Sequence, residues 1–134
     1  MANETAKRFI DALHKLEAER DLETIVSLFA ADCDINNVVT VDNNQKHDAR
    51  KFWQAYRDNF GEVESVFRNE IITENRAALE WKTTGTSNDG NEFEYEGVSI
   101  LEIKGERITR FFAYFDPNKL GRQIVDEKGK EANG

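Results

Sequence analysis

The strongest constraint on the fold of this chain is a change in hydrophobic period near Glu62. Before this point, apolar residues recur every three or four positions, which is the pattern of amphipathic helices. After it, apolar and polar residues alternate, which is the pattern of half-buried strands. Helices followed by a run of strands indicate an α+β domain. The sequence therefore predicts three N-terminal helices packed on a strongly curved antiparallel sheet.

Helix signals divide the first half of the chain. The predicted helices cover residues 4–18, 21–32 and 48–61. Asp21 and Asp48 stand where N-caps are expected, and Gly61 suits the end of the third helix. The β-branched segment 33–41 predicts a strand, followed by a turn-rich loop at 42–45.

Turn signals divide the second half into four strands. They occur at 74–75, 87–90 and 104–105, which predicts an antiparallel meander. Beyond Gly97 both faces of the strand become apolar, so a second copy of the chain is expected to cover the outer face of the sheet. One domain is expected over residues 1–120, followed by a polar, mobile tail at 121–134.

Composition excludes several functions. The net charge of -8 and a pI near 4.8 oppose binding to nucleic acids. No apolar run approaches the roughly 20 residues of a membrane helix, and the polar N-terminus lacks a signal-peptide core, so a cytoplasmic protein is expected. Cys33, His14 and His47 show none of the close spacings of a zinc site. We expect neither a metal nor a cofactor.

The final strand ends in a carboxylate among aromatic residues. Simple alternation puts Ile108 and Asp116 on one face, together with Arg110, Phe112 and Tyr114. The opposite face then carries Thr109, Phe111, Ala113 and Phe115. Because both faces are largely apolar, the strand is expected to be covered on both sides. Asp116 would then be an ionisable group in a sheltered place, which is a frequent property of functional acids.

Several short segments resemble a known family. They are 28–32, 77–81, 84–86, 89–90, 96–101, 105–108 and 114–116, and the resemblance spans residues 4–120. In order and spacing they are similar to a SnoaL-like member of the NTF2-like superfamily, which includes ketosteroid isomerases, polyketide cyclases and limonene epoxide hydrolases. The resemblance implies a cone-shaped fold with a pocket between helices and sheet, into which the Tyr114 and Asp116 side of the last strand points. This fold hosts several reactions and also proteins that only bind or dimerise.

The resemblance also separates the reactions. The cyclases and epoxide hydrolases place a working aspartate near the end of the final strand, where this chain has Asp116. The ketosteroid isomerases place their base where this chain has Asn37, an amide that takes up no proton at neutral pH. The Arg-x-Asp of an epoxide hydrolase is not found near Leu79. The sequence therefore argues against steroid isomerisation and epoxide opening.

Two residues are candidates for acid–base chemistry. In an apolar pocket, the pKa of Asp116 would rise toward neutrality, making it a proton acceptor for a carbon acid beside a carbonyl. Alternatively, Asp116 caps a turn before Pro117. His47 is a candidate second acid or base at the pocket mouth, and the alternative is a solvated loop histidine.

Aromatic residues are the candidate ligand-binding set. They can enclose an apolar ligand, while Tyr and Trp offer hydrogen bonds, although each could equally be plain core. Arg110 is expected either to pair with Asp116, to bind an anionic ligand, or to form an ordinary ion pair on the sheet. The expected substrate-binding residues are Trp53, Tyr56, Trp81, Tyr95, Arg110, Phe112 and Tyr114.

Three functions follow from the sequence. The first is a homodimeric protein that binds a small, apolar, carbonyl-bearing molecule, with Asp116 as proton acceptor in an isomerase-like or cyclase-like step. The second is a ligand-binding or dimerisation module of the same fold without catalysis. The third is an adaptor that binds another protein through the outer sheet. An open cavity containing Asp116 favours the first, and a closed core with Asp116 capping a turn favours the others.

Overall fold

The structure is a computed structural model that describes residues 2–39 and 47–121. The expected loop at 42–45 and all but the first residue of the expected tail at 121–134 lie outside the described residues. The elements are α1 (Ala2–Glu19), α2 (Leu22–Val26), β1 (Phe29–Asn37), α3 (Ala49–Asp58), β2 (Phe60–Ile72), β3 (Arg76–Ser87), β4 (Glu92–Lys104) and β5 (Arg107–Phe115). A helical turn at 117–121 follows β5.

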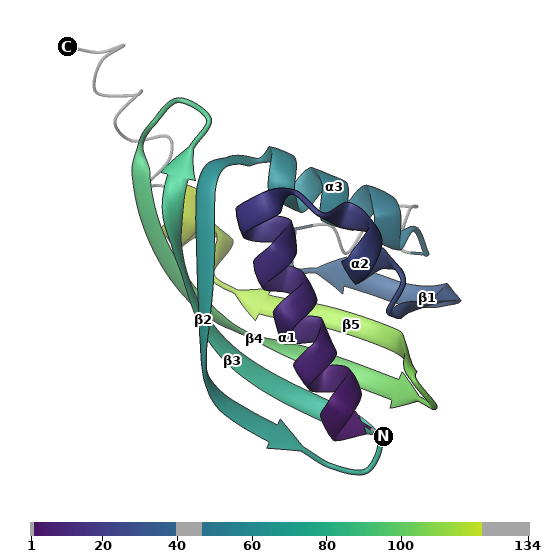
Figure 1. Ribbon diagram of the computed structural model, residues 1–134. Coiled ribbons are helices and arrows are strands. Elements are labelled where there is room, and N and C mark those ends of the chain that lie inside the picture. Colours follow the sequence, from purple (N-terminus) through teal and green to yellow (C-terminus); the bar gives the residue numbers. More distant parts are fainter. Residues whose placement is uncertain (1, 40–46, 122–134) are drawn as a thin grey trace, which may run out of the picture.

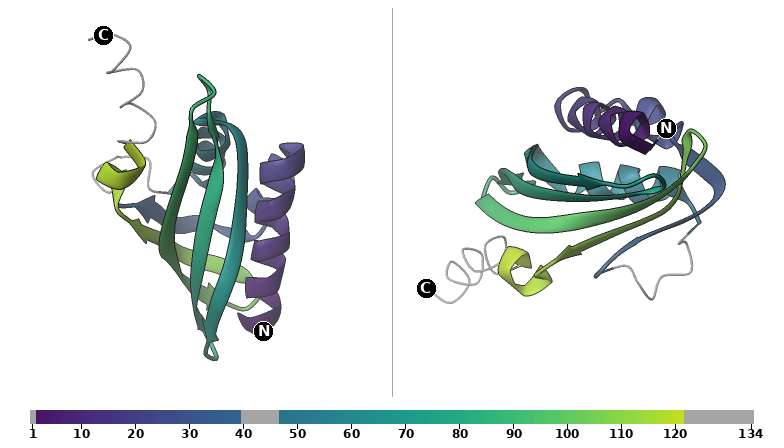
Figure 2. Two further views of the ribbon diagram at one scale, coloured as in Figure 1. Left: turned by 90° about the vertical axis from the view of Figure 1, so that its left-hand side faces the viewer. Right: turned by 90° about the horizontal axis from the view of Figure 1, so that it is seen from below.

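The five strands form one sheet in the order β1-β5-β4-β3-β2. Strands β2 to β5 are the predicted antiparallel meander, and β1 adds to β5 in parallel. Figure 1 shows α1 and α3 on the same side of the sheet, and Figure 2 shows the curvature of the sheet around that side. The predicted α+β fold, with N-terminal helices on a curved antiparallel sheet, is confirmed.

Helix α1 begins at Ala2, two residues before its predicted start, whereas the second helix begins at its predicted N-cap but is shorter than predicted. Asp21 accepts a hydrogen bond from the Thr24 amide at 3.2 Å, as an N-cap should. Helix α2 nevertheless ends at Val26, and β1 begins at Phe29 rather than at residue 33. Phe29 pairs with Ile108 across the sheet and is buried, so burial against β5 overrides the helical pattern of residues 27–32.

A β-bulge near the start of β5 changes which side chains face the helices. Ile103 of β4 pairs with Ile108, but the preceding residue of β4, Glu102, pairs with Arg110, so Thr109 is an extra residue. Ile108 is fully buried, and the inward series continues after the bulge with Phe111. The alternation predicted from the sequence is therefore wrong beyond Thr109.

A cluster of aromatic rings joins the helices to β1 and β5. The ring centroid of Trp53 lies 5.8 Å from that of Phe9, 6.0 Å from Phe29 and 5.2 Å from Phe111. All four side chains are buried. Such edge-to-face and tilted contacts add to the free energy of burying the rings. They hold α3 against α1 and the sheet.

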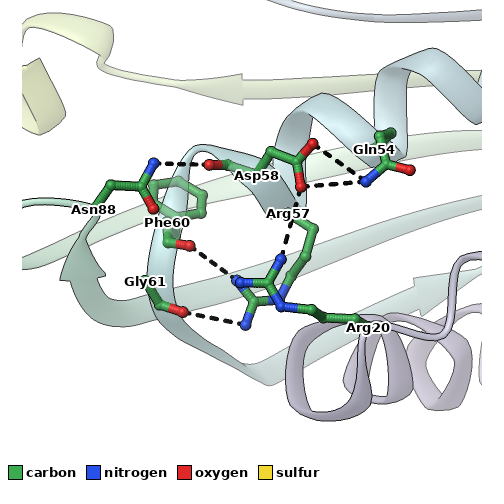
Figure 3. A network of polar contacts seen from close by, with 7 residues as sticks. All are labelled: Arg20, Gln54, Arg57, Asp58, Phe60, Gly61 and Asn88. Carbon is green, nitrogen blue, oxygen red and sulfur yellow. Dashed lines mark hydrogen bonds and ion pairs between the residues drawn. The ribbon is translucent and has the colours of Figure 1, made fainter.

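Polar contacts hold the C-terminal end of α3 in place (Figure 3). The Arg57 guanidinium donates to the carbonyl of Phe60 at 3.0 Å, and Asn88 of the β3–β4 hairpin donates to the carbonyl of Asp58 at 2.8 Å. The Asp58 carboxylate also lies 3.7 Å from the Arg20 guanidinium at the end of α1. The end of α3 is thus tied to three other segments.

Within residues 2–39 and 47–121, no helix combines the length and the apolar character needed to cross a membrane.

Candidate functional site

A cavity of about 410 Å³ lies between the helices and the inner face of the sheet. Its size falls in the range of small-molecule sites. Of the sequence-predicted binding residues, Trp53, Tyr56, Trp81 and Tyr95 line it. Further walls come from α1, α3 and every strand, through Phe9, Leu13, Ile35, Phe52, Phe60, Phe67, Phe111, Ala113 and Phe115 among others. The site is therefore concave and mainly apolar.

The indole of Trp81 is fixed on the floor of the cavity. Its N–H donates to the Ser99 hydroxyl at 2.9 Å, across to the neighbouring strand. Its ring lies 5.2 Å from that of Tyr95, and the facing residue on β4 is Gly97. A side chain at position 97 would collide with the indole, so glycine is required for this packing. These contacts position Trp81 and Tyr95 as one wall.

A buried carboxylate organises the polar end of the cavity, which is the part lined by Tyr56, Ser65 and Thr83. Glu17 is only 3% exposed. One of its oxygens accepts the Ser65 amide at 2.9 Å, and the other accepts the Ser65 hydroxyl at 2.6 Å and the Tyr56 hydroxyl at 2.8 Å. The Ser65 and Thr83 hydroxyls lie 2.7 Å apart. Four residues from α1, α3, β2 and β3 thus form one hydrogen-bonded group, and all but Glu17 line the cavity.

The two cavity tyrosines are held in their neutral form. Burial raises the pKa of the Tyr56 phenol well above its ordinary value, and the negative charge of Glu17 adds to the effect. Burial, again followed by the charge of Glu17, also raises the pKa of Tyr95. At physiological pH both hydroxyls therefore carry their protons and can take part in hydrogen bonds as donors.

Asp116 lies outside the cavity. Its side chain is exposed and accepts hydrogen bonds from the amides of Asn118 at 2.9 Å and Lys119 at 3.2 Å. It therefore caps the helical turn at 117–121, as the second interpretation of the sequence proposed. The expected orientation into the pocket is wrong because the bulge at Thr109 turns the other face of β5 inward.

Three further predicted residues also lie on the outer face of β5. Tyr114 is 49% exposed, and neither it nor Phe112 lines the cavity. The guanidinium of Arg110 lies 3.5 Å from the Glu102 carboxylate and 5.9 Å from the centre of the Phe112 ring. Arg110 thus forms the ordinary ion pair on the sheet, so its expected placement at the pocket is wrong.

His47 is also separated from the cavity. Its Nδ1 lies 2.8 Å from the Cys33 carbonyl, and because a carbonyl can only accept, this nitrogen carries a proton. The residue borders a different, more open hollow, together with Phe29, Asp48 and Arg50. The expectation that His47 sits at the mouth of the main cavity is therefore wrong. Burial raises the pKa of the Cys33 thiol, in keeping with an inert core residue.

Sequence reasoning missed Glu17, Ser65 and Thr83. A signal for Glu17 existed, because it lies four residues after Leu13 and eight after Phe9, on the apolar stripe of α1. A carboxylate on a core-facing stripe needs buried hydrogen-bond partners. Ser65 and Thr83 carry no comparable local signal, since they face the cavity only through strand alternation.

The SnoaL-like domain family matches residues 6–111, and the chain belongs to this family. A solved NTF2-like protein of unknown function from Burkholderia pseudomallei is 17% identical, with a TM-score of 0.77 over 92% of this chain and 97% of that chain. TerC, co-crystallised with polyporic acid, is 18% identical, with a TM-score of 0.69 over 86% and 91%. AusH from Aspergillus nidulans is 20% identical, with a TM-score of 0.68 over 87% and 86%. No curated protein matches the chain. At these identities the likeness to the solved structures concerns the fold.

Proposed function

We propose that this protein binds a small, mostly apolar molecule in the cavity between α1, α3 and the sheet. The observation that carries the proposal is a ring-lined hollow of about 410 Å³ onto which the hydrogen-bonded Tyr56, Ser65 and Thr83 hydroxyls open. Apolar walls supply affinity through burial, and a few placed polar groups supply orientation. TerC, which shares the fold, was co-crystallised with polyporic acid, and this supports a small-molecule ligand for the present protein.

Binding without chemistry is the better-supported form of this function. None of the described residues that line the cavity is Asp, Glu or His. A proton acceptor in direct contact with a ligand, as an isomerase-type or cyclase-type step would need, is therefore missing from that lining. If turnover occurs, its proton would pass through the Tyr56 or Ser65 hydroxyl to Glu17 rather than to Asp116.

Filling the cavity should weaken binding strongly. Ala113 lines it from β5, so Ala113→Phe adds a ring inside the hollow. We expect its affinity for 2-methoxynaphthalene, a probe without a hydrogen-bond donor, to fall at least about tenfold. Quenching of tryptophan fluorescence measures the affinity, because Trp53 and Trp81 line the same space.

The matched control is Thr84→Phe, which adds the same ring at an exposed position on the opposite face of the sheet. It should bind the probe as the unmodified protein does. Native mass spectrometry of protein purified from its own host provides a second check through a retained small molecule. Failure of the unmodified protein to bind both this probe and its hydroxyl-bearing analogue 2-naphthol would overturn the proposed function.

We also propose a homodimer through the outer face of β4 and β5. Two apolar cross-strand pairs lie there, Val98 with Tyr114 and Ile100 with Phe112, and the single chain leaves Tyr114 half exposed. A second copy would bury this strip symmetrically. Sedimentation velocity should give the dimer mass, and Tyr114→Glu should shift the protein to the monomer. A monomeric unmodified protein would contradict the dimer and leave this face for a different partner.

A further inference from the structure

We propose that the cavity selects ligands that present a hydroxyl group, because the oxygens at its polar end are left as hydrogen-bond acceptors. The inference rests on the proposed function and names the chemical class of the ligand: a compact cyclic or aromatic alcohol or phenol. It differs from the carbonyl-bearing ligand expected from the sequence. The argument depends on where each hydroxyl proton of the buried group is directed.

The Glu17 carboxylate fixes the direction of the first hydrogen bonds. An ionised carboxylate has no proton to give, so it accepts from every partner. It accepts the Tyr56 hydroxyl at 2.8 Å and the Ser65 hydroxyl at 2.6 Å. Each of these hydroxyls has only one proton. Neither Tyr56 nor Ser65 therefore has a proton left to offer to the cavity.

The same count of hydroxyl protons applies to Thr83. The Ser65 and Thr83 hydroxyls lie 2.7 Å apart, and either oxygen could be the donor on geometry alone. Because the Ser65 proton is already given to Glu17, Thr83 must be the donor in this bond. Tyr56 and Thr83 both line the cavity. Their hydroxyl oxygens therefore offer only lone pairs to the cavity. These lone pairs can accept a hydrogen bond from a ligand.

Tyr95 completes the recognition of a hydroxyl. Its side chain is 4% exposed and lines the cavity, and no described residue makes a hydrogen bond with its hydroxyl. Its proton is therefore available to a ligand oxygen in the cavity. A ligand hydroxyl can accept from Tyr95 and donate to Tyr56 or Thr83. A carbonyl can only accept, so it can pair with the Tyr95 hydroxyl but gives no hydrogen bond to the lone pairs of Tyr56 or Thr83.

A protonated amine is a weaker fit than a hydroxyl. It too can donate, but burying a cation is costly unless a carboxylate pairs with it directly. Glu17 is not among the residues that line the cavity, and the Tyr56 and Ser65 hydroxyls already occupy its oxygens. The observations therefore favour a neutral donor.

Three naphthalene probes test the selection. 2-Naphthol donates a hydrogen bond, 2-methoxynaphthalene has the same ring without the donor, and 2-acetonaphthone carries a carbonyl instead. We expect the unmodified protein to bind 2-naphthol about tenfold more tightly than either of the other two, as a satisfied hydrogen bond in a buried site would give. Isothermal titration calorimetry measures all three affinities.

Glu17→Gln should reverse the preference. The glutamine carbonyl can still accept the Ser65 amide, but its NH2 group donates to the hydroxyl oxygens, which frees the Tyr56 proton to point into the cavity. We expect 2-acetonaphthone to become the preferred probe. The control is Glu19→Gln, an exposed position on the same helix, which should keep the preference for 2-naphthol.

A second variant keeps the test decisive if the glutamine variant does not fold. Tyr56→Phe removes one acceptor oxygen and should reduce the tenfold preference to about twofold or less. Thr84→Val removes a hydroxyl from an exposed position on the opposite face of the sheet and should leave the preference unchanged. Equal affinities of the unmodified protein for the three probes would overturn this inference and leave the proposed function intact. Binding of none of them would overturn the proposed function itself.

Discussion

Replacing Glu17 with alanine is expected to lower the free energy of unfolding by about 3 kcal/mol, because three buried donors would lose their acceptor. These donors are the Ser65 amide, the Ser65 hydroxyl and the Tyr56 hydroxyl. Hydrogen bonds to charged groups are worth more than neutral ones, and a cavity water can replace only part of the loss. Urea unfolding followed by circular dichroism gives the difference.

The control for this variant is Glu19→Ala, at an exposed position one half-turn along α1. It should change the free energy of unfolding by no more than about 0.5 kcal/mol, as surface substitutions usually do. If Glu17→Ala costs less than about 1 kcal/mol, Glu17 does not organise the polar end of the cavity. The hydrogen-bond directions on which hydroxyl selection depends would then lose their origin.

Gly97→Ala is expected to lower the free energy of unfolding by about 2 kcal/mol, with a change in tryptophan fluorescence. A methyl group there would collide with the Tyr114 carbonyl and lie 2.6 Å from the indole ring of Trp81. Backbone cannot yield cheaply, so the indole must move away from its bond to Ser99. Since Trp81 forms the floor of the cavity, the affinity for 2-methoxynaphthalene should also fall.

Gly121→Ala is the matched control for the glycine variant. No described residue lies within 4 Å of a methyl group at that position, so stability should be unchanged or slightly raised. An unaltered fluorescence spectrum and full stability in Gly97→Ala would contradict the tight packing of β4 against Trp81. Thermal unfolding and fluorescence emission of both variants test this packing.

Most of the architecture could be predicted from the period of the apolar residues. The meander, the caps at Asp21 and Asp48, and the packing of helices on one face all depend on local patterns that the structure confirms. The start of β1 at Phe29 could not be predicted locally, because it depends on pairing with Ile108 more than seventy residues later. Long-range pairing of this kind leaves no trace in the helical pattern of residues 27–32.

The sequence predicted part of the candidate site. The extra residue in the bulge of β5, Thr109, explains most of the residues that were predicted to line the cavity but do not. Trp53, Tyr56, Trp81 and Tyr95 line the cavity as expected, since their faces follow from regular elements. The bulge at Thr109 shifts β5 by one position, which places Tyr114 and Asp116 outside. A slip of one residue exchanges the two faces of a strand. Because the sequence of β5 is apolar on both faces, it did not show which face points toward the cavity.

The most direct test of the account is a map of amide chemical shifts on adding 2-naphthol to the unmodified, isotope-labelled protein. The account predicts that the largest shifts fall at Ser65, Thr83 and Tyr95, around the polar end of the cavity. Amides near Asp116 and Tyr114 should move little. Shifts concentrated at those two residues, with the cavity amides unchanged, would contradict the claim that this protein binds its ligand between the helices and the sheet.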